Sequence, residues 1–326
     1  MAEQRDVVNA RKPSLWWNQP WTLVEGCTRC SAGCNDCWAL AMEQRTGRAV
    51  EGGGIRLRWD RLDEPLHWRK PRVVAVWNDL FHPDVPDEFI EAVYGMAALC
   101  PPSTFIALTK RAERAAEWHA PPSDIGTREE CVMAAAAHHG GIVWDSRGSN
   151  REHYYGIAGG TARLSDEHFA RRRAWPGWPV PNVMLGVTCE YDAYLHRVEQ
   201  LVQTPAAVRF VNAHLLGPLD LSAYLPEENP GPEPYESEVE MFDRIARDDA
   251  SKVSWLAIEC NRPFRGDPAE WWGWCESLVE QARAAGVPVW VKQGPTATGG
   301  VTHDLADFPE ACRVREFPQE GATDHV

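Results

Sequence analysis

The sequence has no long apolar segment. No run of about 18 apolar residues occurs in the chain, so we expect no membrane-spanning helix. Residues 1–14 also lack the apolar core of a secretory signal peptide. Together these absences predict a cytoplasmic protein, in which thiols stay reduced. Closely spaced cysteines therefore indicate metal binding or redox chemistry rather than a disulfide framework.

The sequence is also short of positive charge. It has 33 Lys and Arg residues against 47 Asp and Glu residues, a formal net charge of −14 at pH 7. Proteins that clamp long DNA without sequence preference usually carry the opposite sign, so this class is disfavoured. A local basic site for a nucleotide or nucleic acid remains open. The segment ARRRAWPGW (170–178), which mixes arginine with tryptophan, is the candidate for it.

Short apolar runs alternate with amphipathic helical patterns along the chain. Helical patterns follow most of these runs, with the clearest at 87–100 and 268–286. The predicted strands are 73–77, 104–109, 183–189, 207–216, 253–259 and 287–293. Apolar strands that alternate with helices are typical of a parallel sheet or barrel. We therefore predict an α/β fold, a partial or complete (β/α) barrel, with its site at the carboxyl ends of the strands.

Two segments interrupt this alternation. Residues from about 119 to 180 are rich in Gly, Pro, His and Arg, which predicts an insertion or lid. Residues from about 222 to 240 are acidic and rich in proline, which predicts a solvated loop. We expect a single domain over residues 1–326 that contains both segments.

The segment GCTRCSAGCNDCWA (26–39) places Cys27, Cys30, Cys34 and Cys37 within eleven positions. Four thiolates could hold zinc in a structural site, although the two cysteine pairs of such sites are usually farther apart. Three thiolates could instead bind three irons of a [4Fe–4S] cluster and leave the fourth iron open. Cys30, Cys34 and Cys37 have the C-x3-C-x2-C spacing of radical S-adenosylmethionine (SAM) enzymes, whose open iron binds SAM. We favour the cluster and keep zinc as the alternative.

Charged residues follow several predicted strands. Asp79 could accept hydrogen bonds from the ammonium group of SAM, or it could cap a helix. Lys110 and Arg111 suit a carboxylate or phosphate, or they are solvated at a helix start. Glu190 could hold the ribose hydroxyls of SAM, or it is a solvated loop carboxylate. Lys292 ends the last predicted strand, where a buried lysine needs a partner.

Six blocks of the sequence resemble, in the same order, the phage Gp37/Gp68-like family (DUF5131), a radical-SAM-like group. The blocks are WNQPWTLVEGCTRCSAGCNDCWA (17–39), 66–90, 105–115, 181–194, 201–221 and 275–293. The resemblance implies a barrel of the radical SAM type that binds a [4Fe–4S] cluster and SAM. It also implies a C-x6-C-x2-C pattern, which selects Cys27, Cys34 and Cys37. We favour Cys27 as the first ligand and Cys30 as an accessory thiol, with the other register left open.

The resemblance carries further expectations for single residues. An aromatic residue beside the last cysteine packs on adenine in typical radical SAM proteins, so Trp38 is the candidate here. The chain departs from the family pattern at two predicted strand ends. NAHLLGP (212–218) lacks the glutamate that the family has there, and IECNRPFRG (258–266) keeps only Glu259 of a glycine-rich stretch. Glu259 is therefore a candidate for cofactor binding in an altered pocket.

The sequence predicts an enzyme that cleaves SAM reductively and starts hydrogen abstraction on a substrate. A nucleobase or nucleotide is the favoured substrate, because of the phage setting of the family and the Arg/Trp segment. Such an enzyme requires an electron donor for its cluster, and we expect no membrane partner. The alternative is a non-catalytic module that binds nucleic acid or protein and is stabilised by a structural four-cysteine zinc site.

Overall fold

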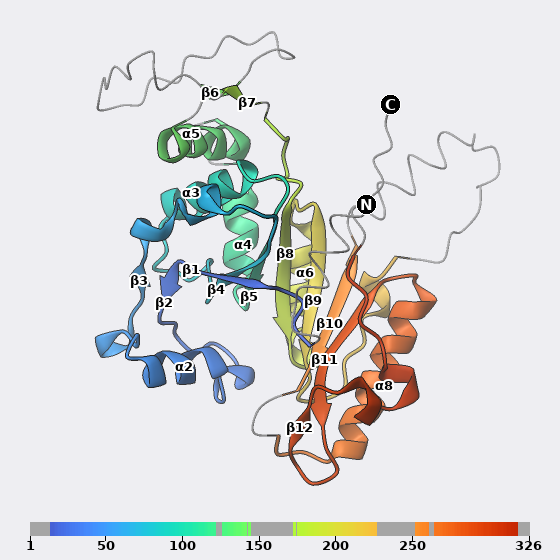
Figure 1. The fold of residues 1–326 in the computed structure, drawn as a ribbon. Coiled ribbons are helices and arrows are strands. Elements are labelled where there is room, and N and C mark those ends of the chain that lie inside the picture. Colours follow the sequence, from blue (N-terminus) through green and yellow to red (C-terminus); the bar gives the residue numbers. More distant parts are fainter. Residues whose placement is uncertain are drawn as a thin grey trace, which may run out of the picture.

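The computed structural model describes residues 14–121, 126–141, 143–144, 172–173, 175–226, 252–260 and 264–318. Its centre is an eight-stranded sheet in the order β1-β4-β5-β8-β9-β10-β11-β12 (Figure 1). The parallel strands follow one another in chain order: β1 (Gln19–Thr22), β4 (Val73–Trp77), β5 (Thr104–Thr109), β8 (Val183–Cys189), β9 (Val208–His214), β10 (Trp255–Glu259) and β11 (Val289–Pro295). The edge strand β12 (Val301–Thr302) pairs antiparallel with β11.

The strands predicted from apolar runs are all present, with ends displaced by no more than two residues. Strands β8 and β10 are buried along their whole length, which explains why both faces of their sequences are apolar. Helices follow the parallel strands and cover one face of the sheet (Figure 1). They are α3 (Asp87–Ala98), α4 (Ala112–His119), α6 (His196–Gln203) and α8 (Pro268–Ala284).

Smaller elements complete the described chain. Helix α2 (Trp38–Thr46) follows the cysteine segment, and α5 (Arg128–Gly140) packs on α3. Two short pairs of strands are β2 (Val24–Glu25) with β3 (Arg56–Leu57), and β6 (Val143–Trp144) with β7 (Arg172–Arg173). Single 3-10 turns are η1 (Ala32–Cys34), η2 (Glu51–Gly53), η3 (Trp59–Arg61), η4 (Glu64–His67), η6 (Asp192–Tyr194), η7 (Ser222–Tyr224), η8 (Leu305–Asp307) and η9 (Glu310–Cys312).

The two faces of the sheet have different cores. The face that the helices cover packs strand residues such as Val211 and Ile258 against Leu278 and Val279 of α8. The opposite face carries a separate aromatic cluster, in which Trp16 packs edge-on against Phe210 and Trp255 at 5.7 and 5.4 Å between ring centroids. We call this opposite side the inner face. Its amino-terminal half is thus filled by side chains.

Gly186 of β8 makes this aromatic cluster possible. A Cβ atom at position 186 would run into the ring of Phe210 on the neighbouring strand β9. A side chain at Gly186 would therefore force Phe210 out of the inner face.

The prediction of an α/β fold with parallel strands is confirmed, and the prediction of a complete barrel is not. No pairing among the described residues joins β1 to β11 or β12, so the sheet is not a closed barrel. At the β11 edge, β12 pairs antiparallel with Gly294 and Pro295, and an antiparallel bridge joins Trp290 to Arg315. The chain order of the strands and the helices on one face are still those of an unclosed (β/α) arrangement.

The predicted insertion and acidic loop lie partly outside the described residues. Within 119–180, α5 begins with a capping box between Thr127 and Glu130 and packs on α3, but 145–171 are not described. Of the acidic segment, 222–226 are described and 227–240 are not. The single-domain prediction stays a prediction. None of the described helices has the length and apolar character needed to cross a membrane.

Candidate functional site

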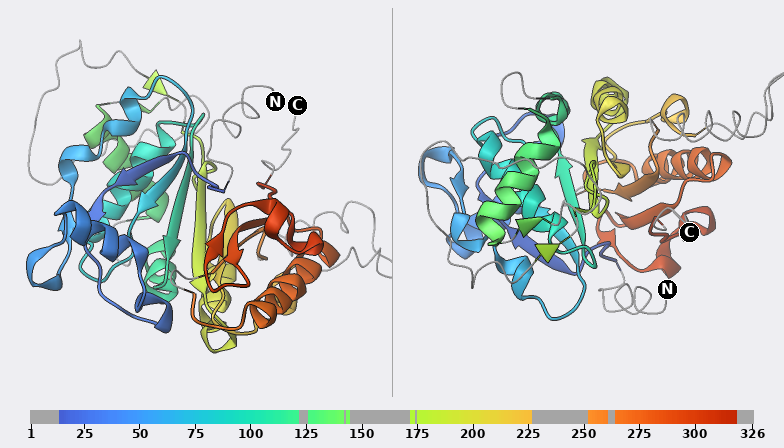
Figure 2. Two further views of the ribbon diagram at one scale, coloured as in Figure 1. Left: turned by 60° about the horizontal axis from the view of Figure 1, so that its bottom comes forward. Right: turned by 90° about the horizontal axis from the view of Figure 1, so that it is seen from above.

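The cysteine segment lies at the carboxyl ends of the parallel strands. It connects β2 with α2, and its residues bond to side chains at the ends of β4, β5 and β8. These strand ends point to the lower side of the sheet in Figure 1, where α2 lies, and the left view of Figure 2 turns that side forward. Sites of parallel α/β proteins form at this end, so the predicted location of the site is consistent with the fold.

Glu43 and Asn78 fix the start of the cysteine segment. The backbone N–H of Gly26, at a φ of +81°, donates to both carboxylate oxygens of Glu43 at 3.0 and 3.1 Å. Asn78 follows β4 with a φ of +62°, a region that asparagine tolerates better than most residues. Its Nδ2 donates to Glu43 Oε1 at 2.6 Å and to the carbonyl of Val24 at 2.8 Å. Through these bonds, Glu43 of α2 and Asn78 after β4 both contact the chain at residues 24–26, where the cysteine segment begins.

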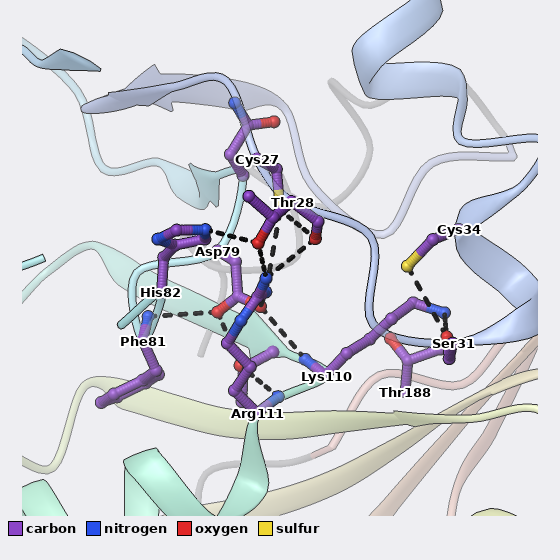
Figure 3. Close-up of polar contacts among 12 residues, drawn as sticks. Cys27, Thr28, Ser31, Cys34, Asp79, Phe81, His82, Lys110, Arg111 and Thr188 are labelled. Carbon is purple, nitrogen blue, oxygen red and sulfur yellow. Dashed lines mark hydrogen bonds and ion pairs between the residues drawn. The ribbon is translucent and has the colours of Figure 1, made fainter. Parts of the chain in front are cut away.

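Arg111 connects Asp79 to the cysteine segment (Figure 3). Its Nη1 donates to Asp79 Oδ2 at 2.6 Å and lies 3.7 Å from Cys27 Sγ. Its Nη2 donates to the carbonyl and the hydroxyl of Thr28 at 2.8 and 2.9 Å. Asp79 also accepts from the hydroxyl of Thr109 at 2.6 Å. Arg111 therefore holds the first cysteine over the end of β5, and Asp79 orients Arg111.

His82 supports the same contact from the segment after β4. Its side chain is buried, and burial lowers its pKa, with the Arg111 cation acting in the same direction. Nδ1 of the neutral ring accepts from the backbone N–H of Asp84 at 3.2 Å, so Nε2 carries the proton. Nε2 then donates to the Thr28 hydroxyl, 2.8 Å away.

Glu190 forms a second buried network beneath the segment. It is fully buried at the end of β8 and is ion-paired with Lys110 and, at 2.8 Å, with Arg197 Nη1 of α6. The hydroxyl of Ser31 donates to Glu190 Oε1 at 2.5 Å. Burial acts to raise the pKa of Glu190, but the two cations and the Ser31 hydrogen bond outweigh it, so the pKa lies below its usual value.

Gly33 brings the cysteine segment close to this network. A Cβ atom at position 33 would lie 2.6 Å from Glu190 Oε1 and 2.8 Å from Lys110 Nζ. Only glycine allows the turn η1 to lie this close to the buried ion pair. Ser31 and Gly33 together therefore fix the middle of the segment against Glu190.

The four thiols have different surroundings. Cys34 is buried, Cys27 and Cys37 are half-buried, and Cys30 is exposed. A hydrogen bond from Cys30 is the main cause that lowers the pKa of Cys34 to about 4, with Ser31 and Lys110 acting in the same direction against burial. The same hydrogen bond and burial raise the pKa of Cys30. Burial and Asp79 raise the pKa of Cys27 to about 11.

Trp38 is the first residue of α2 and follows Cys37, whose thiol makes no capping hydrogen bond to the helix. The Trp38 side chain is 46% exposed and meets Trp77 of β4 edge-on, with ring centroids 4.8 Å apart. The ring therefore combines a fixed position with a solvent-exposed surface, which a ligand could cover.

A third polar cluster lies on the inner face at the ends of β9, β10 and β11. Glu259 is ion-paired with Lys292, and Asn212 Nδ2 donates to Glu259 Oε1 at 3.0 Å. Burial acts to raise the pKa of Glu259, but Lys292, His214 and the two hydrogen bonds lower it to about 2. Glu259 is therefore ionised, and it bonds to residues of its own sheet.

Asp79, Lys110, Arg111 and Glu190, all predicted as site residues, lie together beneath the cysteine segment. Glu259 and Lys292 form the separate cluster on β10 and β11. Sequence reasoning missed the residues that bond these groups to the segment or to one another: Thr28, Ser31, Glu43 and Arg197. Thr28 and Ser31 lie inside the cysteine segment, and this position could have marked them as candidate site residues. Nothing in the sequence pattern of Glu43 or Arg197 distinguishes them from surface residues of a helix.

The Arg/Trp segment offers little exposed aromatic surface where it is described. Trp175 Nε1 donates to Glu129 at 2.5 Å, and Trp178 packs against His119 and Trp118. Both tryptophans are partly buried and pack against the helix-side core. Stacking of bases on these two residues is therefore not supported.

The donor types in the cysteine segment are those of an iron–sulfur cluster. Thiolates are the usual ligands of such clusters, and the segment supplies four thiols. Arg111 and Lys110 contribute positive charge next to Cys27 and Ser31, where bound thiolates and sulfide would concentrate negative charge. Within the described residues, no three His, Cys, Asp or Glu side chains are grouped so as to ligate one metal ion.

Fold and site together define an α/β protein with a parallel sheet whose carboxyl end carries a thiol-rich segment held by buried ion pairs. Among protein families, the one described as protein of unknown function (DUF5131) matches residues 13–305. The chain therefore belongs to this family. No curated protein and no solved structure matches it.

Proposed function

We propose that this protein is a radical SAM enzyme of the phage Gp37/Gp68-like type, built on an unclosed (β/α) barrel. Its cysteine segment holds a [4Fe–4S] cluster through Cys34, Cys37 and one of Cys27 and Cys30. Bound there, the cluster supplies the electron that cleaves the sulfonium of SAM and starts hydrogen abstraction. A nucleobase or nucleotide is the favoured substrate, and an external electron donor is required.

One observation carries this proposal: two buried ion-pair networks hold the cysteine segment at the carboxyl end of a parallel sheet. Arg111 with Asp79 holds its first part, and Glu190 with Lys110 holds its middle. A structural metal knuckle requires no such attachment, because the metal itself fixes the loop. A cofactor that must face a substrate on the inner face does require a fixed position relative to the strands.

The ion pairs define roles for the residues beneath the segment. Arg111 and Lys110 would stabilise negative charge on bound thiolates, and their partly exposed cationic side chains could bind a ligand carboxylate. Asp79 and Glu190 already accept several hydrogen bonds from the protein, so they act as positioning residues for the two cations. This differs from direct contact with SAM, which the sequence suggested for both.

Trp38 and the inner face supply the remaining parts of the site. The exposed ring of Trp38 next to Cys37 is available to pack on the adenine of SAM. The inner face beneath the segment is apolar at its amino-terminal half and polar at the strand ends. A substrate that enters at the strand ends would therefore meet polar side chains first and the aromatic cluster beneath them.

The function is tested by SAM cleavage under anaerobic conditions. The reconstituted protein is incubated with SAM and dithionite, and 5′-deoxyadenosine is quantified by chromatography. The wild type and the Cys131→Ser control, whose thiol lies on α5, are expected to form 5′-deoxyadenosine, and Cys34→Ser is expected to form none. A wild type that forms no product above the rate of Cys34→Ser contradicts the proposal.

A further inference from the structure

Asn212 has a buried hydrogen-bond acceptor that the protein does not use. The residue lies on β9, is 2% exposed, and shares the inner face with Phe210. Its Nδ2 donates to Glu259, but its Oδ1 is buried with no hydrogen-bond partner. A buried polar atom without a partner costs free energy, and in a native structure it calls for an explanation.

The orientation of the Asn212 amide follows from its neighbour. Glu259 is paired with Lys292 and is ionised, so its carboxylate only accepts hydrogen bonds. The amide must therefore present its NH2 group to Glu259, and its oxygen must face away from Glu259. Flipping the amide would place two oxygens against each other. The open acceptor is thus a consequence of the Glu259 contact.

Lys292 places a hydrogen-bond donor in the same cluster. Its side chain is 14% exposed, and its ammonium group carries three N–H donors, one of which bonds to Glu259. Glu259 and Lys292 compensate each other's charge, so the pair can present single hydrogen-bonding groups to a ligand. Phe210, two residues before Asn212 on the same face, belongs to the buried aromatic cluster below it.

We infer that Asn212, Glu259 and Lys292 form a subsite for the polar edge of a nucleobase. Asn212 Oδ1 accepts from an exocyclic amino group or ring N–H, and Lys292 donates to a neighbouring ring nitrogen or carbonyl. This inference rests on the proposed function and deepens it, because it assigns the ligand class that the inner face takes. The base belongs either to SAM or to the substrate, and both present the same chemistry.

The subsite is tested by calorimetric titration of the full-length protein with paired nucleosides. Adenosine is compared with purine riboside, which lacks the 6-amino group, and cytidine with the pyrimidinone riboside that lacks the 4-amino group. The wild type is expected to bind the amino-bearing member of at least one pair about tenfold more tightly. Asn212→Ala is expected to bind both members alike. Thr204→Val, which removes a partly buried hydrogen bond near the amino end of β9, is expected to keep the preference.

Competition with S-adenosylhomocysteine distinguishes the two sources of the base. Competition with the preferred nucleoside assigns the subsite to the adenine of SAM, and simultaneous binding assigns it to the substrate. The inference is overturned if the wild type binds no nucleoside, if it does not distinguish the members of either pair, or if folded Asn212→Ala keeps the preference. The wild-type comparison tests the inference even if Asn212→Ala fails to fold. The titrations need no reductant, so their outcome does not depend on whether the protein cleaves SAM.

Discussion

Replacement of Glu190 by glutamine tests whether the buried network holds the cysteine segment. Glu190→Gln keeps the shape of the side chain but removes the negative charge that faces Lys110 and Arg197. Glu190 is 0% exposed, whereas the Lys110 side chain is 17% exposed and that of Arg197 is 4% exposed. Breaking a buried ion pair by removing one partner costs about 3 to 5 kcal/mol. Because Lys110 can be partly rehydrated, we expect the lower end, about 3 kcal/mol.

The assay is urea unfolding at pH 7, followed by tryptophan fluorescence. Glu113→Gln is the matched control, because the Glu113 side chain is 58% exposed and its contact with His196 is 3.8 Å long. We expect the control to change the free energy of unfolding by less than about 0.5 kcal/mol. The double variant with Lys110→Met should be more stable than the sum of the single changes predicts, by about 1 to 3 kcal/mol. Equal effects of Glu190→Gln and Glu113→Gln would refute the reasoning.

Glu190 also predicts a direction of pH dependence. Its pKa is lowered in the folded state, so its contribution to stability is fully present above its unfolded pKa. The contribution is lost as the pH falls through the folded pKa, because Glu190 is then protonated in both the folded and the unfolded state. The Glu190→Gln variant should therefore lose less stability on acidification than the wild type, as measured by urea midpoints from pH 6 to pH 3.

Three further predictions concern the core and the thiols. Burial lowers the pKa of His119 to about 4, so below about pH 6.5 the unfolded state binds more protons than the folded state. The free energy of unfolding, measured with urea, should therefore fall by about 2 kcal/mol between pH 7 and pH 5. This fall should be absent in His119→Gln. Gly186→Ala should destabilise by about 1 to 3 kcal/mol, whereas Gly273→Ala in α8, where a Cβ meets no atom, should be neutral or stabilising in the same assay. Cys27→Ala should lose reconstituted iron and Cys30→Ala should retain it, because Cys27 lies against Arg111 and Cys30 is exposed. The reverse result would make Cys30, not Cys27, the first cluster ligand.

Most of the parallel strands and the helices that follow them could be predicted from sequence because their signals are local. Runs such as VMLGVTC (183–189) are apolar on both faces, and the structure buries them on both faces. The edge of the sheet could not be predicted in the same way. Strand β12 has only two residues and begins a few positions after β11, so no apolar run in the sequence predicts the antiparallel pairing at this edge.

The position of the site could be predicted, but the pairing of its charges could not. Charged residues after parallel strands must meet at one end of the sheet, which brings Asp79, Arg111 and Glu190 together. Which carboxylate pairs with which cation depends on strand order and on side-chain reach across neighbouring strands. Arg197 lies on α6, seven residues after Glu190, and its side chain contacts Glu190 because α6 packs back against the end of β8.

The most direct test of the central claim is metal analysis of the anaerobically purified and reconstituted protein. Iron, sulfide and zinc are measured per chain, and EPR spectra of the dithionite-reduced protein are recorded with and without SAM. We predict about four irons per chain and an EPR signal that changes when SAM is added. One tightly bound zinc per chain, with no cluster even after reconstitution, would contradict the account and make the cysteine segment a structural knuckle.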